Sequence, residues 1–149
     1  MRPQLPFFAA LCLFGLAMPG CGGGDPLTRT EASYDRAVQN GCRACEATAE
    51  VTSMCLARAE ASNPFTGPQW DCQRAAYDRF PNELNAFYSC QANVMQTYES
   101  CIGRALMTCP PVGADITACS DALGPGVEAC PMPTDAAAVA AVTACFAGG

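Results

Sequence analysis

Residues 82–106 read NELNAFYSCQANVMQTYESCIGRAL, the longest clean helical pattern in this chain of 149 residues. Its apolar residues recur at steps of three and four, which is the spacing of one helix face. The stripe comprises Leu84, Phe87, Tyr88, Met95, Tyr98, Cys101, Ile102 and Ala105, interrupted by Gln91. Cys90 lies eleven residues before Cys101. Because that distance is about three turns of helix, we expect a central helix that carries both cysteines on similar sides.

A second long helical pattern precedes the central one. Thr28-x-x-Glu31 has the form of a capping box, in which two side chains satisfy the free N–H groups of a first helical turn. From there the pattern predicts one helix to about Ala61, with Asn40-Gly41 as the place where it breaks or kinks. One face of this helix would carry Val38, Cys42, Cys45, Ala49, Thr52, Leu56 and Ala59.

A short helix is expected between two prolines. Pro68 suits the first turn of a helix, because no N–H donor is needed there, and the pattern continues to Phe80. Pro81 then stops that helix. Its aromatic residues Trp70 and Phe80 are expected in the core, together with Phe87 of the central helix.

Two further helices are expected after the central one. Asp115 can cap a short helix over 115–123, which Gly124-Pro125 would close. Thr134 can cap a last, Ala-rich helix over 135–146. Strand signals are scarce, since no run alternates apolar and polar residues for longer than chance. The sequence therefore predicts an all-α fold, a small disulfide-rich bundle of four or five helices joined by Pro/Gly loops.

The composition excludes several classes of function. The chain contains no His, which removes Ser-His-Asp and Cys-His catalysis and imidazole metal ligands. Its formal net charge is −6, and its eight basic residues are all Arg. A surface of this charge repels nucleic acid and anionic lipid, so neither is an expected partner. No cofactor is expected either.

The first 21 residues, MRPQLPFFAALCLFGLAMPGC, have the pattern of an export signal. Arg2 supplies the positive start, and Leu5–Met18 is an apolar run of the length of a signal core. That run is short for a transmembrane helix. Pro3, Pro6 and Pro19 would interrupt a buried helix, so a removable signal is the better interpretation.

This signal ends in Met18-Pro19-Gly20-Cys21 and resembles that of a bacterial lipoprotein precursor. In that class, a cysteine after a small residue is diacylated on its sulfur and becomes the first mature residue. Cys21 matches that cysteine and Gly20 the small residue, whereas Met18 and Pro19 depart from the common pattern. The resemblance implies a lipid anchor at Cys21 that holds the domain at a membrane. The alternative is an ordinary secretory signal that leaves Cys21 as a thiol.

The anchor would be joined to the domain by a short Gly-rich tether. The expected organisation is a signal peptide at 1–20, the lipidated Cys21 and tether at 21–27, and a cysteine-rich helical domain at 28–149. The resemblance also implies a location in the cell envelope. No aspartate follows Cys21, which in proteins of this class is compatible with the outer membrane.

Ten cysteines remain once Cys12 leaves with the signal and Cys21 carries lipid. They are Cys42, Cys45, Cys55, Cys72, Cys90, Cys101, Cys109, Cys119, Cys130 and Cys145. An even number of cysteines in an exported domain of this size indicates a disulfide framework. The sequence does not give its connectivity.

Helix spacing offers one partial pairing. Cys45 and Cys55 are ten residues apart, close to the eleven between Cys90 and Cys101. Two antiparallel helices could therefore be laddered by Cys45–Cys101 and Cys55–Cys90. This arrangement resembles the helical hairpins of twin CX9C proteins, although only Cys45 and Cys55 have the spacing of those proteins.

Cys42-Arg43-Ala44-Cys45 is a CxxC motif, for which two chemical roles compete with a structural one. A thiol–disulfide exchange site would use Arg43 and a helix start to lower a thiolate pKa. Such motifs normally follow a strand in a βαβ unit, which the pattern lacks. A zinc site would need a second CxxC or histidines, and the chain has neither. Bridges between helices suit these cysteines better.

The sequence favours a non-enzymatic, lipid-anchored protein of the cell envelope with a structural or protein-binding role. Its expected partners are a membrane, through Cys21, and an unidentified protein. One alternative is a secreted or periplasmic cysteine-rich binding module without lipid. The other is a thiol oxidoreductase that uses Cys42 and Cys45.

Overall fold

The computed structural model describes residues 24–147, and this part of the chain forms helices and no strand, which confirms the all-α prediction. The helices are α1 (Pro26–Cys42), the short 3-10 helix η1 (Ala44–Glu46), α2 (Ala49–Ala61), α3 (Pro68–Arg79), α4 (Pro81–Ala105), α5 (Gly113–Glu128) and α6 (Ala136–Ala147). The six α-helices of the described chain exceed the four or five expected, because the first long pattern forms two helices.

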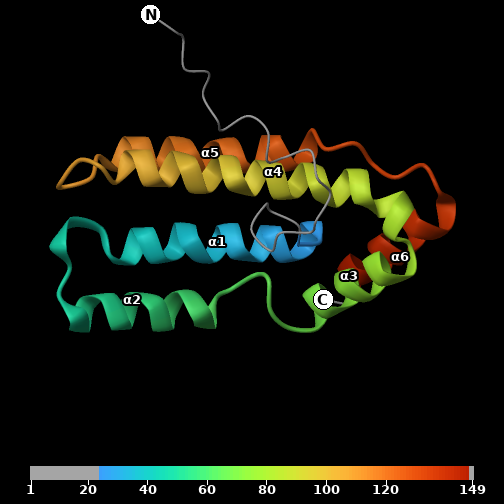
Figure 1. The fold of residues 1–149 in the computed structure, drawn as a ribbon, viewed down its shortest axis with the longest axis horizontal. Helices are drawn as coiled ribbons and strands as arrows, with labels where there is room; N and C mark the ends of the chain where they lie inside the picture. The colour runs from blue at the N-terminus through green and yellow to red at the C-terminus, as the bar shows by residue number, and fades with distance from the viewer. Residues whose placement is uncertain (1–23, 148–149) are drawn as a thin grey trace, which may run out of the picture.

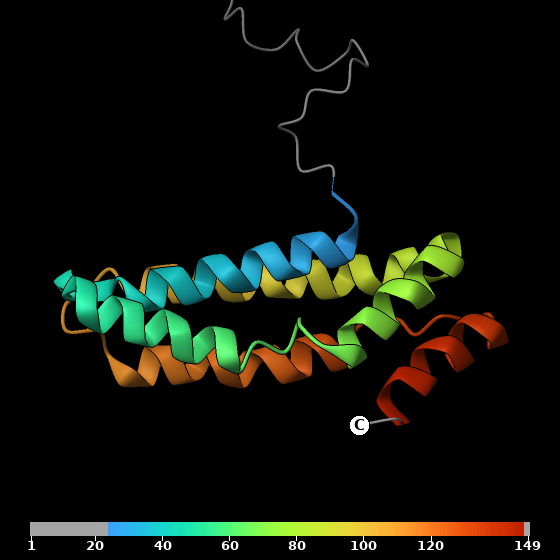
Figure 2. The same ribbon diagram turned by 90° about the horizontal axis from the view of Figure 1, so that it is seen from below.

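The helices form a bundle that is closed on three of its sides. α1, α2, α4 and α5 run side by side, and α3 and α6 lie at one end (Figure 1). α4 packs closely on α1 and on α5, and α1 packs on α2, whereas α2 and α5 are not a closely packed pair. Figure 2 shows α1 and α4 in one layer and α2 and α5 in the layer below. The side between α2 and α5 is therefore open.

α1 begins earlier than the capping box predicted. Asp25 is the N-cap, and its carboxylate accepts hydrogen bonds from the backbone N–H of Thr28 at 3.0 Å and from the Thr28 hydroxyl at 2.6 Å. The Thr28-x-x-Glu31 capping box is therefore wrong. Pro26 and Leu27, expected at the end of the tether, lie in the first turn of the helix, where Leu27 is 1% exposed.

The long helix expected from the Thr28-x-x-Glu31 capping box to about Ala61 breaks after α1. Cys45 has a φ of 57°, a left-handed backbone conformation that no α-helix contains. α2 then starts afresh with Thr48 as N-cap, whose hydroxyl accepts a hydrogen bond from the N–H of Val51 at 3.3 Å. A break or kink was expected at Asn40-Gly41, and the observed break lies just beyond that pair.

The main hydrophobic core lies where α3 and α6 meet the start of α4. Trp70, Leu84, Phe87 and Tyr88 are buried in this cluster, with Phe80 partly buried against it. The aromatic residues expected in the core therefore lie there. Their edge-to-face contacts, such as Phe87–Tyr88 with ring centroids 5.0 Å apart, are the favoured geometry for aromatic pairs.

The central helix agrees closely with its prediction. α4 spans Pro81–Ala105, one residue earlier than expected at each end. Its buried residues follow the predicted stripe, except that Ala92 is fully buried while Gln91 is only partly buried. α3 also starts at Pro68 as predicted, and the Gly67 before it has a φ of 87° that a residue with a side chain rarely adopts.

The two last helices differ from their predictions in how they begin and end. α5 begins at Gly113, so Asp115 lies in its first turn and is not its N-cap as expected. The helix continues through Gly124-Pro125 to Glu128, although that dipeptide was expected to end it. The fixed φ of proline is helical, and Asp121, whose carbonyl lacks an N–H partner at Pro125, is exposed to water. In α6, Asp135 rather than Thr134 supplies the cap, since its Oδ1 accepts from the N–H of Ala138 at 2.8 Å.

Candidate functional site

The structure contains the disulfide framework that the cysteine count indicates. The pairs are Cys42–Cys55, Cys45–Cys109, Cys72–Cys145, Cys90–Cys130 and Cys101–Cys119. The expected ladder of Cys45–Cys101 and Cys55–Cys90 is wrong, because Cys45 bonds to Cys109 and Cys55 bonds to Cys42. Sequence spacing alone did not identify which helices are neighbours.

A ladder does exist, between α4 and α5. Cys90 bonds to Cys130 and Cys101 bonds to Cys119. Cys119 and Cys130 are eleven residues apart, as Cys90 and Cys101 are, so two antiparallel segments meet in register. This matched spacing was the signal in the sequence that would have identified the correct partner. The ladder fixes α5 along α4.

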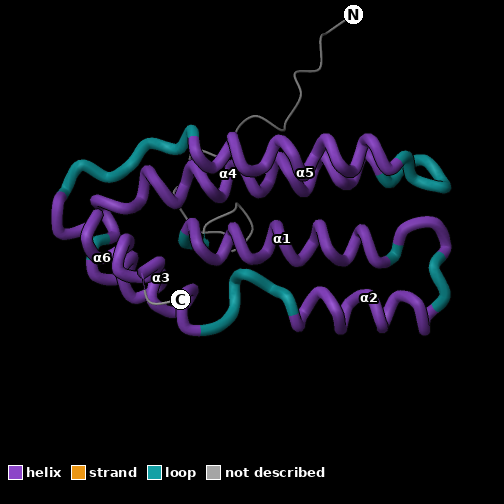
Figure 3. The backbone as a smooth tube through the Cα atoms, turned by 180° about the vertical axis from the view of Figure 1, so that it is seen from behind, coloured by secondary structure: helices purple, strands orange, loops and turns teal. Residues whose placement is uncertain are grey.

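Two further bridges, Cys42–Cys55 and Cys45–Cys109, lie near the C-terminal end of α1. Cys42, the last residue of α1, bonds to Cys55 in the middle of α2. Cys45 of η1 bonds to Cys109 in the loop after α4. The two cysteines of the CxxC motif are thus held by different partners, with no disulfide between them. Figure 3 shows that the α1–α2 and α4–α5 loops lie at this same end.

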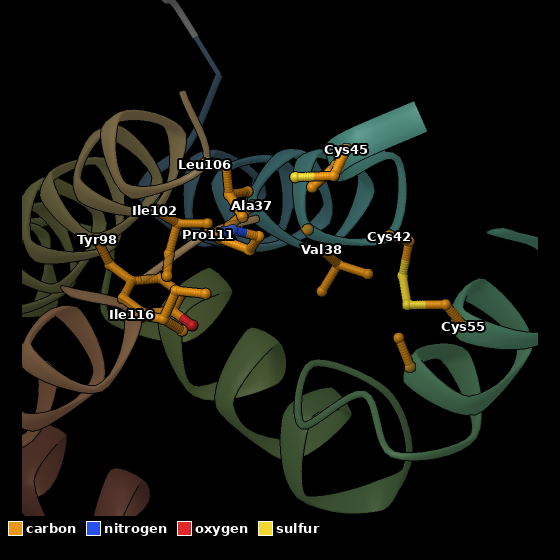
Figure 4. A pocket seen from close by; sticks show the side chains of 13 residues that line it. Ala37, Val38, Cys42, Cys45, Cys55, Tyr98, Ile102, Leu106, Pro111 and Ile116 are labelled. Carbon is orange, nitrogen blue, oxygen red and sulfur yellow. A yellow bond between two sulfur atoms is a disulfide. The ribbon is translucent and has the colours of Figure 1, made fainter. Parts of the chain in front are cut away.

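An apolar cleft of about 460 Å³ lies along the open side of the bundle, at this end. α1 and α4 contribute its floor, including Val38 and Ile102, while α2 and α5 contribute its walls, including Ala59 and Ile116. Figure 4 shows Tyr98, Ile102 and Ile116 grouped on one side and the Cys42–Cys55 bridge on the other. The cleft is thus the gap that a bundle closed on all four sides would fill with side chains.

The lining of the cleft carries no charge. None of the thirteen lining residues is acidic or basic, and Tyr98 contributes the one side-chain hydroxyl. A charged ligand group placed here would lose its water without finding a counter-charge, which is costly. The ion pairs of the described chain lie elsewhere, as in Arg36 and Glu99, where hydrogen bonding to Arg36 lowers the pKa of Glu99. The cleft is therefore suited to neutral, apolar groups.

Exposed apolar side chains surround this end of the bundle. Val51 and Met54 are more than half exposed in the first turns of α2, and Met107 is 83% exposed in the loop after α4. Val112, just before α5, is about half exposed. Sequence reasoning missed this site, because its residues come from α1, η1, α2, α4, the α4–α5 loop and α5, which only the fold brings together.

A second, smaller cavity of about 210 Å³ lies between α4 and α5, lined in part by Val94, Leu123 and Arg104. Among residues 24–147, no group of three or more His, Cys, Asp or Glu side chains is arranged to hold a metal ion. No helix in the same range is both long and apolar enough to span a bilayer. The lipid anchor predicted at Cys21 lies outside the described residues.

Comparisons with known proteins found no match to this chain among family models, curated proteins or solved structures.

Proposed function

We propose that this chain is a non-enzymatic, lipid-anchored domain of the bacterial cell envelope that binds a neutral, apolar ligand in the cleft between α2 and α5. The observation that carries the binding role is the uncharged cleft of about 460 Å³ on the open side of the bundle. Ligand pockets typically enclose about 300–1,000 Å³ and are mostly apolar. The volume and the lining both fall within that description.

The disulfide bridges support a binding role because they hold the cleft in shape before a ligand arrives. Cys101–Cys119 fixes one wall, α5, and Cys42–Cys55 fixes the other, α2. A preformed site loses less entropy on binding than one that must order its walls. Burial of apolar ligand surface then contributes about 25 cal/mol per Å².

The position of the cleft is compatible with the anchor proposed at Cys21. That residue precedes Pro26, the start of α1, by five positions. The cleft lies at the other end of α1, and a helix of 17 residues is roughly 25 Å long. An anchored domain could therefore keep the cleft away from the membrane that holds its N-terminal end. The outer membrane is the proposed location.

The binding role can be tested with N-phenyl-1-naphthylamine, a neutral dye that fluoresces in apolar surroundings. We expect the oxidised protein to bind it and Val38→Glu, which places a carboxylate in the floor of the cleft, to weaken binding about tenfold or more. Met132→Glu is the matched control, because Met132 is exposed and does not line the cleft. Equal weakening by both substitutions would show that the dye binds elsewhere.

The anchor can be tested by fractionation and mass. Cys21→Ser should move the protein from the membrane fraction to the soluble fraction, since two acyl chains provide stable attachment and their loss removes it. The intact mass of the detergent-extracted protein should begin at Cys21 and include the acyl groups. A mature protein without lipid would instead support a secreted or periplasmic binding module.

A further inference from the structure

We infer that α2 is a movable wall of the cleft, latched by the Cys42–Cys55 bridge, and that reduction of this bridge releases α2 and the bound ligand. This inference rests on the binding function proposed above. It assigns a regulatory role to one of the five bridges.

α2 is held to the bundle weakly. None of its 13 residues is buried, whereas each of the other five α-helices in the described chain has at least one buried residue. Its close packing is with α1 alone. Because buried apolar area is the main source of stability, a helix without buried residues depends on other links to stay in place.

The chain is fixed on both sides of α2. Before it, the buried Cys42 fixes the end of α1. The connection from there to α2 turns at Cys45, whose backbone conformation is left-handed and not helical. After it, Phe65 packs edge-on against Tyr34 and Trp70, with ring centroids 5.1 and 4.9 Å apart. Motion of α2 would therefore be confined to the segment between these two points, and the rest of the core would be undisturbed.

The latch is accessible to a reductant. Cys55 is exposed while its partner Cys42 is 6% exposed. The three bridges remote from the α1–α2 connection contain no exposed cysteine: their members are Cys72, Cys145, Cys90, Cys130, Cys101 and Cys119. Cys45–Cys109 has an exposed member too, but it ties η1 to the α4–α5 loop and leaves α2 free. Since exchange rates depend on access, Cys42–Cys55 is exposed to attack.

The reductant would be a dithiol, either a small molecule or a protein with two neighbouring thiols. One thiolate attacks the Sγ of Cys55, forms a mixed disulfide and expels Cys42 as a thiolate, which takes up a proton. In the mixed disulfide, the first sulfur of the reductant is bonded to Cys55. The second thiolate of the reductant attacks that first sulfur and expels Cys55 as a thiolate, which also takes up a proton. The bridge gains two electrons and two protons, and the dithiol becomes a disulfide.

Release of α2 removes one wall of the site. Cys55 and Ala59 of α2 line the cleft, opposite Ile116 of α5. If the unlatched wall occupies its closed position for only about a tenth of the time, the apparent dissociation constant of a ligand rises about tenfold. Reduction would therefore convert a binding form into a releasing form without unfolding the aromatic core.

The test uses Cys42→Ala/Cys55→Ala and, as a matched control, Cys72→Ala/Cys145→Ala, which removes a bridge between α3 and α6. Hydrogen exchange followed by mass spectrometry reports protection helix by helix, and N-phenyl-1-naphthylamine reports binding. We expect the first variant to lose amide protection in α2 alone and to bind the dye about tenfold more weakly. The control should keep both its α2 protection and its affinity.

The wild-type protein provides a second measurement that does not depend on a variant. Titration with dithiothreitol, followed by alkylation and peptide mapping, should label Cys42 and Cys55 while Cys72, Cys90 and Cys101 remain unlabelled. Unchanged α2 protection in the first variant, or reduction of a remote bridge before Cys42–Cys55, would overturn the inference. Failure of the oxidised wild-type protein to bind the dye would overturn the proposed function instead, and hydrogen exchange would still decide whether α2 is latched.

Discussion

Tyr88 is fully buried in α4, and its hydroxyl group has no hydrogen-bond partner among the described residues. A buried polar group without a partner costs about 1–3 kcal/mol. We therefore expect Tyr88→Phe to raise the free energy of unfolding by about 1 kcal/mol. Tyr77→Phe is the control, because its exposed hydroxyl bonds weakly to Asn85 at 3.4 Å, and its effect should stay small. Urea unfolding measures both, and a clear loss of stability in Tyr88→Phe would reveal a partner such as buried water.

The same residue predicts a response to alkali. Burial raises the pKa of Tyr88 from 10.0 to about 12. Between these values the unfolded chain loses the phenolic proton while the folded chain retains it. The free energy of unfolding should therefore be unaffected by this group below about pH 10 and fall, by at most about 3 kcal/mol, as the pH rises to about 12.

Urea unfolding at about pH 9 and about pH 11.5 would measure this fall, and Tyr88→Phe should remove most of it. Tyr34, whose pKa is also raised by burial, would contribute a remainder in the same direction. An equal fall in the wild-type protein and in Tyr88→Phe would contradict the assignment to Tyr88.

At the scale of the elements, helices with strong internal patterns were predictable, whereas the place where α5 ends was not. α4 follows from one apolar stripe, and α3 from Pro68 in its first turn. Beyond Pro125, the α5 segment meets residues that are remote in sequence: Gly126 lies against Val94, and Cys130 bonds to Cys90. Local turn chemistry does not report such contacts, so the expected end at Gly124-Pro125 was wrong.

Gly126 allows α5 to approach α4 closely. A Cβ atom at this position would lie 2.9 Å from Cγ1 of Val94, whose β-branched side chain has few alternative rotamers. We expect Gly126→Ala to lower the free energy of unfolding by about 1–3 kcal/mol. Gly103→Ala in α4 is the control, because nothing lies within 4 Å of its added Cβ. That change should raise stability by up to about 1 kcal/mol, since Ala favours helix over Gly.

A double-mutant cycle separates the steric contact from a general effect of the substitution. If the clash with Val94 is the cause, Gly126→Ala should cost less in a Val94→Ala background, with a coupling energy of about 0.5–3 kcal/mol. Urea unfolding of the four proteins gives that value. Strictly additive effects would mean that the close approach at Gly126 does not limit the packing of α4 and α5.

At the scale of the whole molecule, the two ends of the bundle are stabilised differently. The end with α3 and α6 contains the aromatic core around Trp70 and Phe87. The end with the cleft contains a smaller cluster of Ile102, Ala105 and Cys119, and both walls beside it, α2 and α5, bury little. The bridges at this end thus replace packing that a closed bundle would supply.

This difference between the two ends explains which features of the candidate site could be predicted from the sequence. Composition and cysteine number predicted a stapled helical domain, and the spacing of Cys90 and Cys101 predicted attachment from one side of α4. The cleft depends on α5, rather than α2, being the helix that these bridges hold. No local pattern in α2 or α5 reports that the two helices remain apart, so the site required the three-dimensional arrangement.

The dependence on sulfur bridges predicts the response of the whole fold to reduction. Removing a native bridge from a small secreted domain typically costs about 2–5 kcal/mol, and the structure has five bridges. Their combined loss would equal or exceed the total stability of about 5–15 kcal/mol that folded domains have. Complete reduction and alkylation should therefore abolish most of the helical circular dichroism at 222 nm.

The oxidised protein carried through the same buffer changes is the control, and the mass of the alkylated protein establishes that every bridge is open. Because α2 and α5 bury least, hydrogen exchange during partial reduction should show their amides losing protection before those of α4. Full helicity in the reduced protein would mean that the apolar core alone specifies the fold. The bridges would then serve to position the walls of the cleft on a bundle that is already stable.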